Sequence, residues 1–241
     1  MPRRLSILLV VPLVAFAAAC LGEDSLQPVS LRGVEGDGNR FYLAGIMGAS
    51  FATLTATDAP AATDPLFTSG GAAGIAFDML DRDWRLEVEG RARDPLAETL
   101  PLGDGVSTSS RTGSGCWSAT VNLWRDYELT DRLDFYVGGG IGGGGYRLGV
   151  DQEFPVQNLS VTGLGTVGGF AWQVGGGLAH ALTERVTLDL GYRFFSLASG
   201  PIVADVAQGG VPWSTVDVDS GFSASELFFA IRVHEPFRGW R

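Results

Sequence analysis

The sequence predicts an all-β protein, an eight-stranded antiparallel up-and-down transmembrane β-barrel with short periplasmic turns and long extracellular loops. Three observations support this prediction. Polar and apolar residues alternate with period two in eight segments. The connections between these segments alternate between short and long. After the first twenty residues, no apolar run approaches the roughly 20 residues that a membrane-spanning helix needs.

Composition narrows the classes of protein that need to be considered. The 241 residues include 35 Gly and 45% hydrophobic residues, and the formal net charge is -10. That much apolar surface can offset the entropy lost on ordering, which argues against disorder. The basic residues other than histidine are all arginine, which excludes P-loop and Schiff-base lysines. So acidic a chain is a poor partner for nucleic acid.

The first segment has the layout of a secretory signal peptide, which we assign to residues 1–19. Arg3 and Arg4 precede a short apolar stretch, and small residues precede Cys20. Export beyond the inner membrane is therefore expected, and acylation of Cys20 stays open as an alternative. We expect residues 20–39 to form a periplasmic lead-in and residues 40–241 to form the barrel. With Cys116 as the other cysteine, no disulfide framework is expected.

The clearest strand pattern runs from Trp84 to Arg93. Apolar or small residues alternate there with arginine and glutamate, a pattern that a helix would not sustain. Seven further segments show the same period with varying strength: Phe41–Phe51, Gly71–Asp78, Trp117–Trp124, Leu133–Tyr146, Phe170–Leu182, Arg185–Phe194 and Leu227–Val233.

The connections alternate in length along the chain. Three are brief polar turns with related sequences: Leu80–Asp83, Leu129–Arg132 and Leu182–Arg185. Four are long and rich in Gly, Pro, Ser, Thr and Asp: Thr55–Thr68, Asp94–Ser114, Leu148–Thr166 and Ala198–Phe222. Short turns at one end and long loops at the other are typical of an outer-membrane barrel.

These features together resemble the OmpA-like and opacity-protein-like outer-membrane β-barrel family. The residues that carry the resemblance are the secretory start, the Gly-rich segment Tyr136–Gly142, the related polar turns and the segment Leu188–Phe194. The resemblance spans Arg40 to Phe237 and implies a barrel in the outer membrane of a Gram-negative type of cell. In that family the last strand commonly ends on an aromatic residue at the chain end, whereas four residues follow Phe237 here.

The alternation alone does not say which face of the barrel lies inside, because a soluble calyx would reverse it. Glycines on the polar parity, such as Gly138, Gly140 and Gly191, suit a narrow lumen without room for side chains. Large aromatics such as Trp117 and Phe170 lie on the apolar parity, as lipid-facing positions require. We therefore expect polar residues to point inward.

Nine charged residues would then face the lumen. Buried charges need partners, so we expect a structural ion-pair network that plugs the barrel. Its expected members are Arg85, Glu87, Glu89, Arg91, Asp134, Asp189, Arg193, Glu226 and Arg232. The alternative is a narrow, charge-selective channel for small solutes, although eight strands leave an interior that side chains can fill.

Signals for catalysis are weak. Lipid A-modifying enzymes share this architecture, but His180 and His234 are expected at the periplasmic rim, far from an outer-leaflet substrate. The glycines of Gly138–Gly143 satisfy a dinucleotide fingerprint, yet no helix follows them. No cysteine and histidine set has zinc-site spacing, and we expect no cofactor.

The sequence thus predicts a noncatalytic outer-membrane protein, structural or surface-interacting in an adhesion-like manner through its extracellular loops. Its expected partners are outer-membrane lipid and, through the loops, host or envelope surface molecules. A narrow channel and a lipid A-modifying enzyme remain the alternatives.

Overall fold

The computed structural model describes residues 39–56, 59–79, 83–102 and 104–236. These residues form nine strands: β1 (Arg40–Ala56), β2 (Ala59–Asp78), β3 (Asp83–Arg93), β4 (Leu96–Pro101), β5 (Thr108–Thr130), β6 (Leu133–Phe154), β7 (Leu159–Ala181), β8 (Val186–Gln208) and β9 (Val211–His234). The expected signal peptide and nearly all of the expected lead-in lie outside the described residues. Helices long and apolar enough to cross a membrane are not found in the residues that the structure covers.

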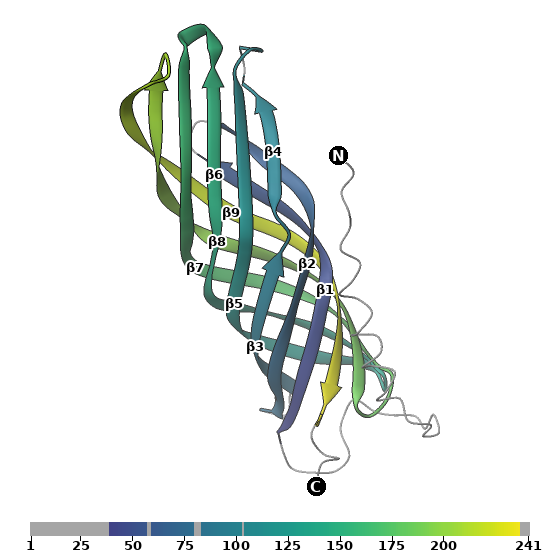
Figure 1. Ribbon diagram of the computed structural model, residues 1–241. Helices are drawn as coiled ribbons and strands as arrows, with labels where there is room; N and C mark the ends of the chain where they lie inside the picture. Colours follow the sequence, from purple (N-terminus) through teal and green to yellow (C-terminus); the bar gives the residue numbers. More distant parts are fainter. Residues whose placement is uncertain (1–38, 57–58, 80–82, 103, 237–241) are drawn as a thin grey trace.

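The strands close into a barrel with eight positions around its circumference (Figure 1). Strands that follow one another along the chain pair antiparallel, except β3 and β4, and β1 pairs with β9 to close the ring. Both β3 and β4 pair with β5, so together they occupy one position. Asp94 and Pro95 separate them, and proline cannot donate a ladder hydrogen bond. The predicted antiparallel up-and-down barrel is confirmed.

The faces are also as predicted. Along β3, Arg85, Glu87, Glu89 and Arg91 are buried in the lumen, whereas Leu86 and Val88 between them are exposed on the outer surface. Exposed apolar residues follow the same parity on neighbouring strands. They include Phe67, Trp117, Val121, Ile141, Phe170, Val174, Leu190, Tyr192 and Leu227. The outer surface is therefore an apolar belt that suits hydrocarbon.

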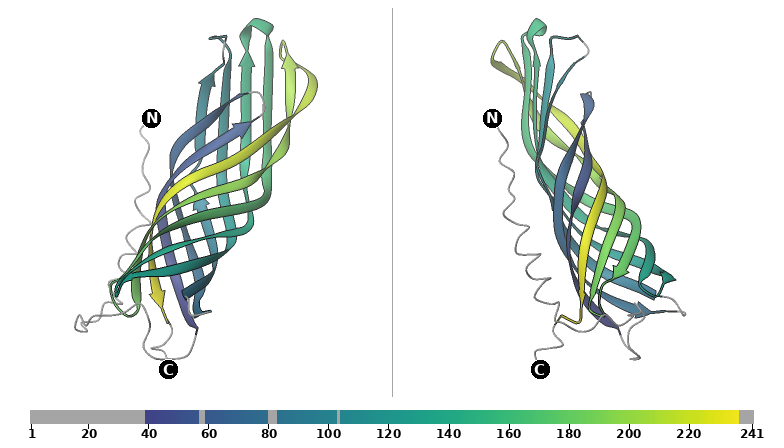
Figure 2. Two further views of the ribbon diagram at one scale, coloured as in Figure 1. Left: turned by 180° about the vertical axis from the view of Figure 1, so that it is seen from behind. Right: turned by 90° about the vertical axis from the view of Figure 1, so that its right-hand side faces the viewer.

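The four long connections are more regular than their composition suggested. Most of the residues in Leu148–Thr166 and Ala198–Phe222 continue the strands β6 to β9. The hairpins turn only at their tips, where Asn158 and the pair Gly209–Gly210 have positive φ. Figure 2 shows the hairpins β4–β5, β6–β7 and β8–β9 reaching beyond the β1–β2 hairpin. They form an extracellular wall.

The polarity of the two barrel faces reverses in this wall. Leu148, Val150, Val161, Ile202 and Val206 point inward there and join an apolar cluster. Outward positions of the wall carry mostly polar residues, including Thr112, Arg147, Asp151, Glu153, Thr162, Thr166, Asp205, Thr215 and Asp217. The wall therefore resembles a soluble β-structure with its own core, stacked on a membrane barrel with a polar core.

Candidate functional site

The candidate site is the polar lumen at the level of the apolar belt. Strand β3 supplies a row of five charged side chains, Arg85, Glu87, Glu89, Arg91 and Arg93, and all are buried. The period of two places them on one face, because successive side chains of a strand point to opposite faces. Their partners come from strands far away in sequence, brought opposite by the closure of the barrel.

The upper group of charges joins three arginines to two glutamates. Arg91 Nη1 and Arg93 Nε donate to Glu226 at 3.0 and 2.7 Å. Arg193 Nη1 lies 2.7 Å from Glu89 Oε1, which also accepts from Arg91 Nε at 3.0 Å. Glu226 is fully buried and Arg193 is 1% exposed. These are charge-assisted bonds in a site without bulk water, so each charge depends on its neighbours.

Aromatic rings complete the surroundings of these guanidinium groups. Arg93 lies 4.1 Å from the centre of the Phe195 ring, and Arg193 lies 4.4 Å from that of Phe228. Such cation–π contacts stabilise a desolvated cation. Phe195 also belongs to the apolar cluster of the extracellular wall, so it joins the charged and apolar parts of the interior.

The lower group consists of two paired arginines. Arg85 binds Asp126 through Nε and Nη2 at 2.7 and 2.8 Å. Arg232 makes the same bidentate interaction with Asp189, through Nε and Nη2 at 2.7 and 2.6 Å. This geometry matches the planar guanidinium to the carboxylate and fixes both side chains.

Glu87 lies between the two groups and differs from the other buried carboxylates. Its donors are neutral: the Tyr42 hydroxyl at 2.9 Å, Asn122 Nδ2 at 3.1 Å and the Trp124 indole at 3.2 Å. Asn122 Oδ1 in turn accepts from Gln173 at 2.7 Å. Glu87 is thus held by polar side chains rather than by an arginine.

The structure brings together most of the nine expected lumen residues. Arg85, Glu89, Arg91, Asp189, Arg193, Glu226 and Arg232 lie in ion pairs, and Glu87 lies in the adjoining hydrogen-bond network. Asp134 is different. It is half-buried near the start of β6, and no ion pair within 4 Å is found for it in the part of the chain that the structure describes. It lies beside the turn, where it interacts electrostatically with Asp126 and Arg232 of the lower group.

Sequence reasoning missed several members of the network. Arg93 and Asp126 form ion pairs, and Asn122, Trp124 and Gln173 bind buried polar groups. A signal for Arg93 was present, because it shares the parity of Arg91. Asn122 and Trp124 also lie on the polar parity of their strand.

Glycines make room for the large lumen side chains. A Cβ at Gly74 would overlap the Tyr42 ring, and a Cβ at Gly191 would overlap Phe228 and the Tyr136 hydroxyl. Gly90, by contrast, faces lipid, and a Cβ there would meet nothing within 4 Å. The lumen glycines are therefore needed for packing, as their parity indicated.

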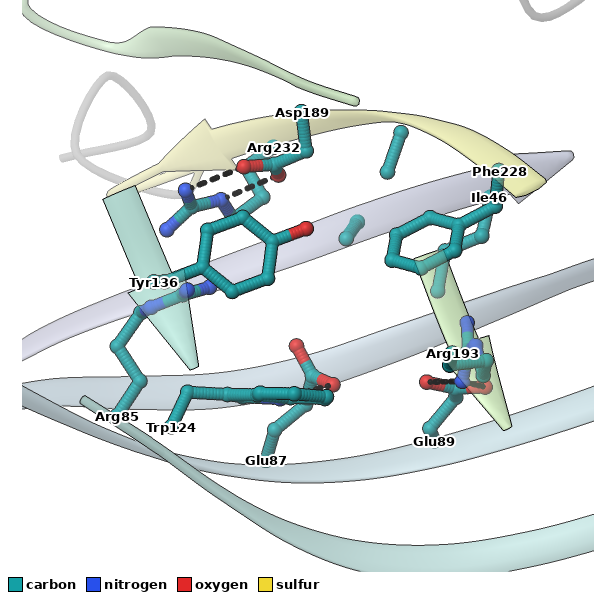
Figure 3. Close-up of a pocket in the computed structure, with 12 residues that line it drawn as sticks. Ile46, Arg85, Glu87, Glu89, Trp124, Tyr136, Asp189, Arg193, Phe228 and Arg232 are labelled. Atoms are coloured by element: carbon teal, nitrogen blue, oxygen red, sulfur yellow. Dashed lines mark hydrogen bonds and ion pairs between the residues drawn. The ribbon is translucent and has the colours of Figure 1, made fainter. Parts of the chain in front are cut away.

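A small cavity remains between the two charged groups (Figure 3). Its volume is about 20 Å³, and its lining includes Glu87, Trp124, Tyr136, Phe228 and Ala230. Figure 3 shows the Glu87 carboxylate and the Tyr136 hydroxyl pointing into the space between the strands. This pocket is about large enough for one water molecule.

The two histidines lie at the end of the barrel that carries the short turns. His234 is buried at the end of β9, where its Nε2 lies 3.4 Å from the Thr187 hydroxyl. His180 is exposed near the end of β7. Groups of three or more metal-ligating side chains are not found among the described residues.

The extracellular wall displays large apolar side chains at its tips and along its strands. Trp213 is 69% exposed, and Val156, Leu164, Val203 and Val211 are also exposed.

In the β4–β5 turn, the Asp104 carboxylate accepts hydrogen bonds from the Ser107 hydroxyl and from the backbone N–H groups of Ser107 and Val106. These bonds, that of the Ser107 hydroxyl first, hold the pKa of Asp104 below its usual range.

Three solved structures illustrate what the chain is similar to. Neisserial surface protein A is 17% identical, with 81% of this chain and 98% of that chain covered and a TM-score of 0.42. The attachment invasion locus protein Ail of Yersinia pestis is 10% identical, with coverages of 80% and 99% and a TM-score of 0.35. The outer membrane protease OmpT of Escherichia coli is 5% identical, with coverages of 85% and 100% and a TM-score of 0.47.

The family assignment comes from the sequence comparison. Among curated proteins, none matches the sequence significantly. Residues 7–223 match the family described as outer membrane protein beta-barrel domain. This match covers most of the chain and agrees with the closed barrel and its apolar outer belt. The chain belongs to this family of outer-membrane β-barrel proteins and is located in the outer membrane.

Proposed function

We propose that this protein is a noncatalytic outer-membrane barrel that acts through its extracellular wall, as a structural or adhesion-like surface protein. The observation that carries this proposal is the wall itself. Its hairpins are paired almost to their tips, have an apolar core and expose Trp213 and Val211 at one tip. Exposed tryptophan on a rigid support is typical of binding hot spots.

The interior of the barrel supports this function over a channel. The two charged groups fill the lumen at the level of the belt, and the apolar cluster fills the wall above them. A solute would have to separate buried ion pairs and then cross a packed apolar region, and both steps are costly.

The positions of the histidines argue against lipid A chemistry. A nucleophile for that substrate needs a base near the outer leaflet, whereas His180 and His234 lie at the opposite end. The Ser110 hydroxyl forms a hydrogen bond with the Thr99 hydroxyl in the wall, and the Ser118 hydroxyl accepts a hydrogen bond from Arg93 Nη1. Neither serine is next to a histidine in the described part of the chain.

The test compares cells that display the protein with cells that display a tip variant, Val211→Ser with Trp213→Ser. We expect the protein to increase attachment to host-cell surfaces or matrix-coated plates, and the variant to lose that increase. Electrophoresis with and without heating checks that both barrels are folded. A matched control is Phe170→Ser, which removes an exposed aromatic residue from the belt rather than from the tip.

Three results would overturn the proposal. One is attachment equal to that of cells without the protein. Another is a large, steady conductance of the purified barrel in planar bilayers, which would support the channel instead. The third is altered lipid A mass on expression, which would support the enzyme.

A further inference from the structure

The cavity in the lumen has a polar, balanced lining. Three arginines, Arg85, Arg193 and Arg232, face three carboxylates, Glu87, Glu89 and Asp189, around it. An additional cation or anion would meet as many like charges as opposite ones. The lining therefore favours a neutral guest that can form hydrogen bonds.

Two groups of the lining have hydrogen-bonding capacity left over. Tyr136 is 3% exposed, and its ring packs against Trp124 and under Arg85. Its hydroxyl has no hydrogen-bond partner among the residues that the structure covers, although a buried hydroxyl without one is costly. Glu87 Oε2 accepts one bond, from Tyr42, and a carboxylate oxygen can accept a second.

Both groups point into the same space (Figure 3). They come from different strands, Glu87 from β3 and Tyr136 from β6, which are separated around the ring by β5. The cavity volume of about 20 Å³ exceeds the roughly 10 to 15 Å³ that one water molecule needs. It is too small for a sugar, an amino acid or a lipid chain.

From this geometry we propose that the cavity is a specific site for one water molecule, which accepts a hydrogen bond from Tyr136 and donates one to Glu87. The water joins Tyr136, whose ring packs under Arg85, to Glu87, which is linked to Glu89 of the upper group through Asn122. This inference is independent of what the extracellular wall binds.

The first test is direct observation in a high-resolution crystal structure of the refolded barrel. We expect an ordered density peak between the Tyr136 hydroxyl and Glu87 in the original protein. The peak should be lost in Tyr136→Phe, which keeps the shape of the ring. A cavity without ordered density in the original protein would overturn the proposal, whatever the variants do.

The second test is urea unfolding in lipid vesicles, which measures whether filling the cavity stabilises or destabilises the barrel. Ala230 is buried and lines the cavity, so Ala230→Val would displace the water. Displacing an ordered water without replacing its hydrogen bonds is unfavourable, whereas filling a dry void is favourable. We expect Ala230→Val to raise the unfolding equilibrium constant in the original protein. In the Tyr136→Phe background the rise should be smaller or reversed.

The single variant Tyr136→Phe should raise the unfolding constant about two- to tenfold, the usual effect of losing one hydrogen bond. Tyr127→Phe is the matched control, because Tyr127 is exposed on the outer surface, and we expect no change from it. An equal effect of Ala230→Val in both backgrounds would contradict the proposal. Should a variant fail to fold, the density in the original protein still decides.

Discussion

Replacing Glu226 by glutamine should destabilise the barrel more than replacing any exposed carboxylate by its amide. Glu226 is fully buried and lies 2.7 Å from Arg93, 3.0 Å from Arg91 and 3.4 Å from Arg193. The upper group has three arginines and two glutamates, a charge of 3 - 2 = +1. The variant Glu226→Gln raises this to +2 within one buried layer.

The expected magnitude follows from these distances. With an effective dielectric constant of about 20, an ion pair at about 3 Å is worth roughly 5 kcal/mol before desolvation is subtracted. Desolvation offsets much of this, but removing one partner leaves the others buried and uncompensated, at about 3 to 5 kcal/mol. Glutamine keeps one oxygen acceptor, so we expect about 3 kcal/mol.

The assay is reversible urea unfolding in lipid vesicles, followed by tryptophan fluorescence and by the heat-dependent shift in electrophoresis. Glu153→Gln, at an exposed position of the wall, is the control and should change stability by less than about 0.5 kcal/mol. The double variant Glu226→Gln with Arg93→Met restores the charge of +1 and should cost less than the sum of the single variants. If Glu226→Gln costs no more than Glu153→Gln, the reasoning about the lumen is refuted.

Three further predictions concern the faces and a turn. Leu190→Arg places a charge on the apolar belt and should cost about 2 to 4 kcal/mol of barrel stability. Val203→Arg on the wall should be tolerated, although both positions are 61% exposed. Equal refolding yields of the two variants would contradict the distinction between an apolar belt and a polar outer face of the wall. Gly191→Ala should cost about 1 to 3 kcal/mol because its methyl group overlaps the lumen side chains, whereas Gly90→Ala should be near neutral, as vesicle unfolding would reveal. The pKa of Asp104 is lowered, so its turn should be ordered at neutral pH and should loosen only as the pH falls through that lowered value. The amide NMR shifts of the turn should report this pH-dependent loosening. The variant Asp104→Asn should abolish the pH dependence of these shifts.

The sequence was most informative where full-sized side chains alternate. Strand β3 is such a case, because Arg85 to Arg93 and the apolar residues between them define both faces without further information. The lumen partners were harder to predict. Arg91 meets Glu226 across the barrel, and that meeting depends on the stagger of strands distant in sequence. The face on which a residue lies can be predicted from the neighbouring sequence, whereas its partner across the barrel depends on the whole fold.

The regular structure of the wall was hidden by its composition. Gly, Pro, Ser and Thr in Ala198–Phe222 are typical of loops, yet Ile202, Ala204 and Val206 alternate there with outward residues. The alternation is inverted relative to the belt, with apolar residues inside, so the expectation of a polar interior concealed it. The pair Gly209–Gly210 was the available sign of a tight hairpin.

The reversal of polarity along single strands determines how deep the protein sits in the bilayer. Were the barrel to rise, phenylalanine and tryptophan side chains of its outer rim would enter water. Were it to sink, aspartates and threonines such as Asp205 and Thr162 would enter hydrocarbon. Either displacement is opposed by the same strands, so a pull on the tips from outside would be resisted without any anchor beyond the barrel.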